Sequence, residues 1–447
     1  GISYDGFYAT MSASSNHPAL KAVSPQAPIL DWFKGDDVHH NGAFMLLDLY
    51  SFAPYMFKKH DNPLTEDHGL PSPIGEDAYE WFLEMKTPAA LTAALPDTLA
   101  FWNEVLLHPD YDDFWQERSL EPHLKDISPA ILVVGGEFDT DDCYGALNTY
   151  KLIHENSPET DLHLVYGPWT HGGWHESDYQ GLGTRKFGEG LSTYFMKNIE
   201  YPFFRYYLEN KGKRPEPVYV FASGSDEWQT MDVWPSDDIA FTPMYLSGGK
   251  SLSTDAPSEE ESSSCYVSDP HDPVPFMDDA SRRDKSYMVA DQSFASARND
   301  VLTFVSDELE ETLKLEGPLK AELEMEISST DADVIIKLID VHPDGYQMLV
   351  RGEVFPARYR YSLSDPQPVE PGKPFRVDFT MNDIAHWVLP GHRLMVQIQS
   401  SWFPLVNMNP QTFMDNIYEA DEKDYVKSEI TVYHQQDKPS RILLPVR

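Results

Sequence analysis

The sequence predicts an α/β fold that carries a helical insertion and a C-terminal β domain. Residues 130–134 form a continuous apolar run, which is typical of a parallel strand covered on both faces. Between residues 41 and 124 apolar side chains recur at three- and four-residue spacing, which predicts helices. From residue 301 onward apolar residues alternate with polar ones, as in 321–327, and this pattern predicts half-buried antiparallel strands.

Composition limits the classes of protein to which the chain can belong. Its 447 residues are too many for one core, so we expect two or three domains. With 34 basic and 73 acidic residues, the net charge is −39, which argues against nucleic acid or an anionic membrane surface as a partner. The sequence has no apolar run of about 18 residues, the length that spans a membrane. Two cysteines, Cys143 and Cys265, do not indicate a disulfide framework.

The first six residues, Gly1 to Gly6, read G-x-S-Y-x-G. This pattern is typical of a nucleophile elbow, a tight strand-to-helix turn in which small residues flank an exposed serine. We expect a helix directly after the turn, with its positive N-terminal end beside Ser3. The N–H of Tyr4, the next residue, is then expected to be one donor of an oxyanion hole. Such a short pattern also occurs by chance, so its meaning depends on the rest of the chain.

An elbow at the first residues also predicts that part of the sheet lies outside this sequence. In an α/β-hydrolase several strands precede the nucleophile, and one of their loops supplies a second oxyanion donor. We therefore expect the α/β domain to be incomplete on its N-terminal side. A segment of the same gene product or a separate chain would complete it.

A helical cap is expected between the first part of the α/β domain, residues 1–40, and the remainder of its sheet. Helical spacing covers three segments separated by proline-containing turns: 42–59, 76–95 and 98–120. Residues 41–125 are thus predicted to cover the active site. Just before them, 31–40 holds adjacent acids and two histidines, which leaves a metal site and a solvated loop as alternative interpretations.

Two predicted strands of the sheet end in polar turns. Strand 130–134 is followed by Asp139, and strand 162–166 is followed by His171. Because the carboxyl ends of parallel strands meet at one edge of a sheet, we expect these two side chains to lie close together. The other elements of this part are predicted at 143–156, 190–210 and 218–221, within a second α/β segment of 126–240.

Residues 241–447 are predicted to form a β-sandwich. Turn signals such as H-P-D-G at 342–345 and P-G at 390–391 separate the alternating segments. Residues 251–264 are rich in Ser and Glu and poor in apolar residues, so we expect a surface loop or linker there.

Ser3, Asp139 and His171 follow the chain order nucleophile, acid, base that α/β-hydrolases use. A serine hydroxyl is a weak nucleophile at neutral pH and needs a base within hydrogen-bond reach. Histidine titrates near neutrality, and a buried carboxylate fixes its tautomer and stabilises the imidazolium ion. The sequence therefore predicts a catalytic triad of these three residues.

These motifs together resemble the cocaine esterase/X-Pro dipeptidyl-peptidase family of serine hydrolases. The resemblance is closest to its α-amino acid ester hydrolase branch, whose members are also named glutaryl-7-aminocephalosporanic acid acylases. Beside the elbow, it rests on GDD at 35–37, FDTDD at 138–142, GPWTH at 167–171, DADV at 331–334, VHPDG at 341–345 and PGHRL at 390–394. It covers essentially the whole chain, and it implies that the C-terminal β domain is a jelly roll.

The resemblance implies a serine acyl-transfer enzyme that acts on esters or amides, in which the three triad residues keep the roles given above. The α-amino acid branch also has a carboxylate cluster that holds the ammonium group of the substrate. Its positions fall here on three residues: Asp37, Asp141 and Asp142. The branch usually has glutamate where this chain has Asp141. Carboxylates without cationic partners near the acyl site would bind a protonated α-amine and set its distance from the serine.

The expected partner is therefore a small-molecule substrate with a free α-amine, without a cofactor or metal. Because the family often forms oligomers, a homo-oligomer is also expected, and the resemblance to exported bacterial enzymes implies a periplasmic or secreted location. Two enzymatic alternatives remain, an X-Pro dipeptidyl aminopeptidase and a general carboxylesterase. A third alternative is a non-enzymatic protein in which an inert hydrolase fold carries a β-sandwich that binds sugar or peptide.

Overall fold

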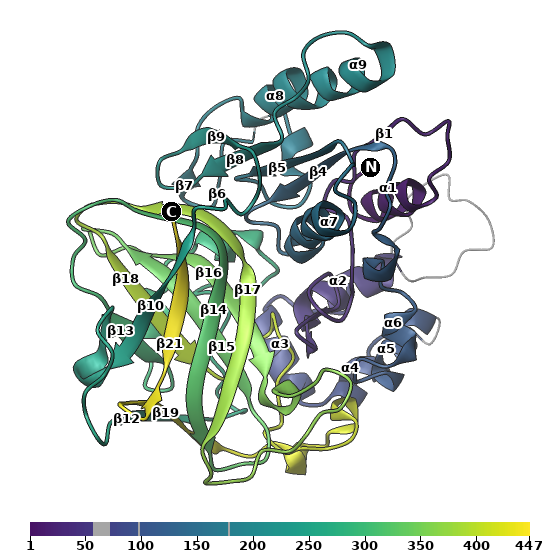
Figure 1. Ribbon diagram of the computed structural model, residues 1–447. Coiled ribbons are helices and arrows are strands. Elements are labelled where there is room, and N and C mark those ends of the chain that lie inside the picture. Colours follow the sequence, from purple (N-terminus) through teal and green to yellow (C-terminus); the bar gives the residue numbers. More distant parts are fainter. Residues whose placement is uncertain (57–71, 97–98, 178) are drawn as a thin grey trace.

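The protein was analysed as a computed structural model that describes residues 1–56, 72–96, 99–177 and 179–447. Its α/β part contains a five-stranded sheet with the strand order β1-β4-β5-β8-β9 (Figure 1). The strands are β1 (Ala22–Val23), β4 (Ala130–Gly136), β5 (Leu162–Gly167), β8 (Val218–Ala222) and β9 (Glu227–Met231). Neighbouring strands are parallel except for β8 and β9, which are antiparallel. The predicted parallel sheet is thus confirmed.

Helices cover both faces of this sheet, which explains the continuous apolar run in β4. Ile131 and Val133 face a core that includes Leu147 and Ile153 of α7 (Cys143–Asn156). The alternate residues of β4 face the other core, which the helices after β5 cover. A strand buried on both faces has no solvated side, so its sequence does not alternate.

The helix predicted at 190–210 forms, but its hydrogen-bond pattern changes in the middle. It consists of α8 (Leu191–Phe195), a π-helical turn (Met196–Glu200) and α9 (Tyr201–Glu209). Pro202 lies in the first turn of α9. Proline lacks the N–H that a continuous α-helix needs at this point, so the preceding turn widens instead of breaking.

The helical insertion lies beside both the sheet and the β domain (Figure 1). Its helices are α2 (Leu46–Met56), α3 (Ala78–Met85), α4 (Pro88–Ala93), α5 (Ala100–Leu107) and α6 (Asp113–Gln116). Helices form in the segments with helical spacing at 76–95 and 98–120, and each of these segments contains two shorter helices. Lys86 has a φ of 62° just before Pro88 and interrupts the first, and the His108-Pro109 turn interrupts the second. The last residues of the segment predicted at 42–59 lie outside the described residues.

Among the helices that the structure describes, none combines the length and the hydropathy needed to cross a lipid bilayer.

The C-terminal part forms a 12-stranded sheet system. Its strands are β10 (Ala240–Ser247), β11 (Ser251–Ser253), β12 (Ser263–Ser268), β13 (Leu302–Val305), β14 (Leu313–Ile327), β15 (Asp333–Val341), β16 (Gln347–Pro356), β17 (Phe375–Val388), β18 (Arg393–Gln399), β19 (Ser428–Gln435), β20 (Lys438–Pro439) and β21 (Arg441–Val446). In β14 the alternating residues Ala321, Leu323 and Met325 are fully buried, as the sequence pattern predicts.

The expected linker at 251–264 is shorter than predicted. Ser251 to Ser253 pair with β10, and Ser263 and Ser264 pair with β19. Leu252 is buried between its neighbours and holds the first of these segments in the sheet. A composition rich in Ser and Glu therefore did not exclude strand pairing at the two ends of the segment.

Candidate active site

Ser3 occupies a strained turn between the edge of the sheet and helix α1 (Tyr4–Ser14). Its backbone has φ 61° and ψ −123°, a conformation that non-glycine residues rarely adopt. Its N–H donates to the carbonyl of Gln26, at 3.0 Å, which fixes the turn beside the end of the sheet. A Cβ added at Gly6 would lie 2.4 Å from that same carbonyl oxygen, so the close approach requires glycine. This geometry is typical of a nucleophile elbow.

The N–H of Tyr4 is at the first position of α1, where no preceding helical carbonyl is available to it. Within the described residues no hydrogen bond of this N–H is found. This N–H can therefore donate a hydrogen bond to an oxyanion that forms next to Ser3. The positive end of the helix dipole would stabilise the same negative charge.

Asp139 and His171 lie together, as their positions after β4 and β5 predict. His171 Nδ1 is 3.2 Å from Oδ1 and 3.1 Å from Oδ2 of Asp139. Asp139 is buried, and its Oδ1 also accepts hydrogen bonds from the N–H groups of Asp141 and Asp142 at the start of α7. These contacts hold the carboxylate in place, so Nδ1 carries the hydrogen and Nε2 is left as the basic nitrogen.

The charge of the surroundings favours protonated His171. Burial alone would lower the pKa of this imidazole, but the charge and hydrogen bond of Asp139, with the charge of Asp141, raise it to about 9. An imidazolium ion that forms when the serine is deprotonated would therefore be stabilised where it lies.

Ser3, Tyr4 and His171 line one cavity of about 210 Å³. The other lining residues come from the loop before α2, from α2 and α5 of the insertion, from the turn before α7 and from the β domain: Trp32, Asp37, Val38, Leu49, Phe52, Phe101, Asp141, Arg283 and Lys285. The insertion thus supplies apolar walls, and charged side chains from three other parts of the chain face the same space. The cavity can hold a small acyl group against Ser3.

Asp37 is one of the acids that face this cavity. Its Oδ2 accepts a hydrogen bond from Trp32 Nε1 at 3.2 Å, and its backbone N–H donates to the carbonyl of Asp141 at 3.0 Å. Burial, followed by the charge of Asp141, raises the pKa of Asp37 to about 7. A cation in the cavity would favour the ionised form and would gain a charge-assisted hydrogen bond.

Asp141 and Asp142 lie in the same acidic cluster but differ in their surroundings. Asp141 faces the cavity and is paired with Arg283 Nη2 at 2.8 Å and Lys285 Nζ at 3.0 Å. The expectation that its carboxylate lacks cationic partners is therefore wrong. Burial would raise the pKa of Asp141, but Lys285 and Arg283 hold it well below its usual range. Asp142 is fully buried, is not among the residues lining the cavity, and lies 3.6 Å from His171 Nδ1.

Asp142 is stabilised in its protonated form. Burial, followed by the charges of Asp37 and Asp36, raises its pKa well above the usual value. Both of its carboxyl oxygens lack a hydrogen-bond partner within the described residues. A neutral carboxyl group at this position adds no negative charge to the cluster.

The sequence left a metal site and a solvated loop as alternatives for residues 31–40, and the side-chain contacts of this segment bear on both. Asp36 accepts hydrogen bonds from the N–H groups of Leu30, Asp31 and Gly145. His39 contacts Tyr418, and His40 contacts Glu353. The clusters of potential metal ligands found among the described residues include none of these side chains. This segment is a tightly bonded turn that carries Asp37 into the cavity.

Sequence reasoning missed Arg283 and Lys285. They lie more than 140 positions after Asp141, at separations of 142 and 144 residues. Their one local signal is the basic cluster at 282–285 in a chain with a large excess of acids. Such a cluster is usually solvated, and only the packing of the β domain against the α/β domain brings it to the cavity.

Comparison with known proteins agrees with this geometry. Residues 1–173 match the X-Pro dipeptidyl-peptidase (S15) family, and residues 205–443 match the X-Pro dipeptidyl-peptidase C-terminal non-catalytic domain. The cocaine esterase of Rhodococcus sp. (strain MB1 Bresler) is 30% identical over 477 residues, an alignment that covers 100% of this chain and 80% of the relative.

Two solved structures superpose on the whole chain with a TM-score of 0.92. One is an aminopeptidase from a marine-sediment Thaumarchaeota archaeon, with 32% identity and 75% of its chain covered. The other is an α-amino acid ester hydrolase, with 33% identity and 76% of its chain covered. These relatives are α/β-hydrolases with a C-terminal β domain, so the predicted fold class is confirmed. The chain belongs to the serine hydrolase family that comprises the S15 X-Pro dipeptidyl-peptidases, cocaine esterase and the α-amino acid ester hydrolases.

Proposed function

We propose that this hydrolase cleaves esters and amides of α-amino acids, including the side-chain amides of β-lactams, through an acyl-enzyme on Ser3. The observation that carries the proposal is the shared cavity, in which Ser3, His171 and the acid Asp37 face the same space. Two of the similar structures carry names, α-amino acid ester hydrolase and aminopeptidase, that denote substrates with a free α-amine.

In the proposed reaction, Nε2 of His171 accepts the proton of Ser3 Oγ while that oxygen attacks the acyl carbon. The N–H of Tyr4 donates a hydrogen bond to the carbonyl oxygen as negative charge develops there. His171 then returns the proton to the leaving alcohol or amine. Water, activated by the same imidazole, hydrolyses the ester to Ser3 and restores the free enzyme.

Asp37 is proposed to bind the ammonium group of the substrate. It is an acid that faces the cavity, and the structure gives it no Lys or Arg partner among the described residues. A fixed carboxylate in a partly buried site binds an ammonium ion more strongly than it does in water. This contact would set the distance between the α-carbon and Ser3, and so select the acyl carbon next to the amine.

The serine mechanism is tested with Ser3→Ala and a phenylglycine methyl ester. We expect kcat to fall by a factor of about 10⁴ or more, because the covalent route is lost. A fluorophosphonate probe should label the unmodified protein and not the variant. Retained hydrolysis by Ser3→Ala would contradict the mechanism.

The role of Asp37 is tested separately with Asp37→Asn. We expect kcat/KM for the free-amine ester to fall by about tenfold or more, which corresponds to about 1.4 kcal/mol, and the N-acetylated ester to be unaffected. Equal losses with both esters would show that Asp37 does not act on the amine.

Release of X-Pro dipeptides is the second candidate function, because residues 1–173 match that family. A dipeptide substrate also presents a free amine, but at one residue's distance from the scissile bond. A panel of Ala-Pro-p-nitroanilide, an α-amino acid p-nitroanilide and an unsubstituted acyl ester separates it from the first proposal and from a general carboxylesterase.

A further inference from the structure

A cluster of three histidines and one aspartate lies in the β domain, away from the cavity that holds Ser3. Asp340 is on β15, and His342 follows directly after that strand. His392 directly precedes β18, which pairs antiparallel with β15 and places Val341 opposite Arg393. His386 comes from β17. None of these side chains lines the active-site cavity.

The distances within this cluster suit a metal ion. One ligand atom from each of Asp340, His342 and His392 lies within 4.8 Å of the other two. His392 Nδ1 is 2.7 Å from Oδ1 of Asp340, and His342 Nε2 is 3.8 Å from Oδ2. The rings of His342 and His392 are in contact, with centroids 4.6 Å apart. Small side-chain rotations would bring all three atoms to the distances of about 2.0–2.2 Å that Zn²⁺ requires.

The two histidines nearest the surface have little else to bind. Within the described residues, the His342 side chain makes no hydrogen bond, and the only one found for the His392 side chain is to Asp340. The His342 side chain is 28% exposed and that of Asp340 only 3%, so the cluster is buried on one side and open to solvent on the other. An ion could enter from the side of His342.

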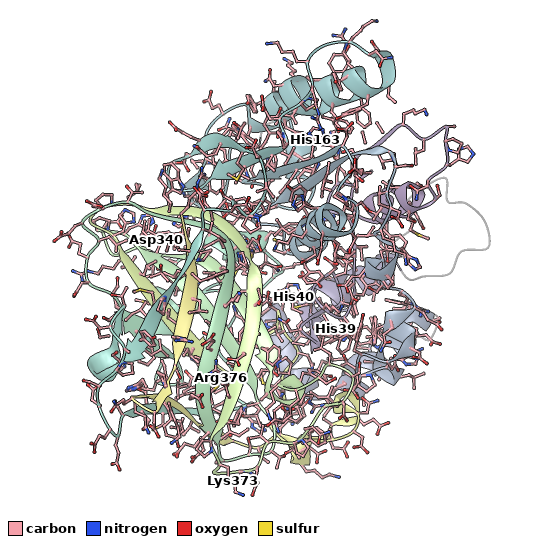
Figure 2. The ribbon with its side chains drawn as sticks, viewed as in Figure 1. His39, His40, His163, Asp340, Lys373 and Arg376 are labelled. Carbon is pink, nitrogen blue, oxygen red and sulfur yellow. The ribbon has the colours of Figure 1, made fainter. Side chains whose placement is uncertain are left out.

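We propose that Asp340, His342 and His392 bind one Zn²⁺ ion or a similar divalent transition metal. Two imidazoles and one carboxylate are a ligand set that zinc accepts, and water would complete the tetrahedron on the exposed side. The ion would connect the end of β15 to the start of β18. Figure 2 places Asp340 at the end of the β domain that faces the five-stranded sheet. This site is independent of the proposed function.

His386 is inferred to orient the aspartate. Its Nε2 is 3.0 Å from Oδ2 of Asp340, and its Nδ1 is 2.8 Å from Oγ of Ser223, which directly follows β8. Hydrogen bonds of this kind hold a ligating carboxylate in place and raise metal affinity. Through this chain, binding at the β domain would also stabilise the contact with the five-stranded sheet.

The test uses the full chain, freed of metal with EDTA, and titrates it with Zn²⁺ by calorimetry and with Co²⁺ by visible absorption. We expect about one equivalent bound, ligand-field bands typical of tetrahedral Co²⁺, and a higher unfolding temperature with Zn²⁺. His342→Phe keeps a ring against His392 but lacks the ligand nitrogen. It should lose the Co²⁺ bands and the thermal shift while its ester hydrolysis without metal is unchanged.

His271→Phe is the matched control, since His271 is an exposed histidine beside a single acid, Asp269, and it should bind like the unmodified chain. Absence of stoichiometric binding would overturn the proposal. So would binding that survives His342→Phe and inhibits ester hydrolysis, because that result would place the ion at Asp139, Asp141 and His171, another group with ligand atoms close together.

Discussion

Asp139 and Asp141 are two positions apart and carry the same charge, yet their neighbours give them different surroundings. Asp139 accepts backbone N–H groups and contacts His171, whereas Asp141 is held between Arg283 and Lys285. A carboxylate beside an imidazole orients it, and a carboxylate between two cations is largely neutralised. At the residue scale, the charge available to a substrate amine therefore depends on these neighbours.

In the proposed mechanism, the pH dependence of catalysis follows from His171. A base must be unprotonated, and the pKa of His171 is raised to about 9, so this residue is mostly protonated at neutral pH. We expect kcat/KM for an ester without an amine, such as p-nitrophenyl acetate, to rise with pH, with its inflection near pH 9 and a plateau above it. Asp139→Asn removes the largest contribution that raises this pKa and should move the inflection to lower pH. A profile that is flat between pH 6 and 9 would contradict the assignment.

Lys285 is predicted to limit amine binding, because it occupies Oδ2 of Asp141. Lys285→Met should leave Asp141 with Arg283 alone and free one carboxylate oxygen for the substrate. We expect KM for an α-amino acid ester to fall by about tenfold, or about 1.4 kcal/mol, with no change for the N-acetylated ester. Lys427→Met, which removes the partner of Asp269 on the surface, is the control and should leave both values unchanged.

At the scale of elements, the polar residues that the α/β domain gives to the site come from four segments. The elbow before α1, the turn after β4 and the loop after β5 are positioned by the sheet. The fourth contribution, the segment that carries Asp37, is tied to the start of α7 through Asp36. Gly145 allows this contact, because a Cβ there would lie 1.9 Å from the carbonyl oxygen of Pro28.

Asp36→Asn tests this connection between elements. The Asp36 carboxyl oxygens accept three backbone N–H groups, from Leu30, Asp31 and Gly145. In Asp36→Asn, an NH₂ group replaces one of the two acceptor oxygens. This group cannot accept a hydrogen bond and would face one or two of the backbone N–H donors. We expect a loss of about 2–3 kcal/mol in the free energy of unfolding, measured by urea denaturation, with reduced fluorophosphonate labelling of Ser3. Asp232→Asn, at an exposed residue directly after β9, should change the stability by about 0.5 kcal/mol at most.

At the scale of the whole molecule, the β domain takes part in the site. It supplies Arg283 and Lys285 to the cavity, and Arg351 to the turn between β4 and Asp139. Arg351 Nη2 donates to the carbonyls of Glu137 and Asp383 and contacts the hydroxyl of Tyr166. The two domains therefore share one network of buried polar groups, which we expect to make them unfold together.

Arg351→Leu tests the coupling between the domains. The substitution removes the donor to the buried carbonyl of Glu137, whereas the carbonyl of Asp383 keeps a hydrogen bond from the Tyr166 hydroxyl. We expect a loss of about 1–3 kcal/mol in the free energy of unfolding, measured by calorimetric unfolding. The end of β4 should also shift, so kcat should fall although Arg351 is not among the residues that line the cavity. Arg376→Leu removes a surface arginine that is paired with Glu322 and Asp378, and it should have little effect. Equal effects of the two substitutions would argue against the coupling.

The sequence by itself determined the features that depend on neighbours along the chain. The apolar run of β4, the alternation in β14 and the glycines of the elbow each reflect local constraints of burial and backbone conformation, so they predict strands and a turn directly. The order of Ser3, Asp139 and His171 at the ends of such elements was enough to nominate a catalytic site. The break at Lys86 was not predicted, because helical spacing continues across a short interruption, whereas the proline of the His108-Pro109 turn marks the break within 98–120.

Only the tertiary structure decided which charges meet. The pairing of Asp141 with Lys285 joins residues 144 positions apart, and the burial of Asp142 depends on the loop and helix packed around it. Neither leaves a periodic signal in the sequence, because an ion pair constrains only its two members once the fold has brought them together. The physical reason is that electrostatic surroundings are set by distance and burial in space, whereas sequence patterns report the direction of a side chain relative to its own element.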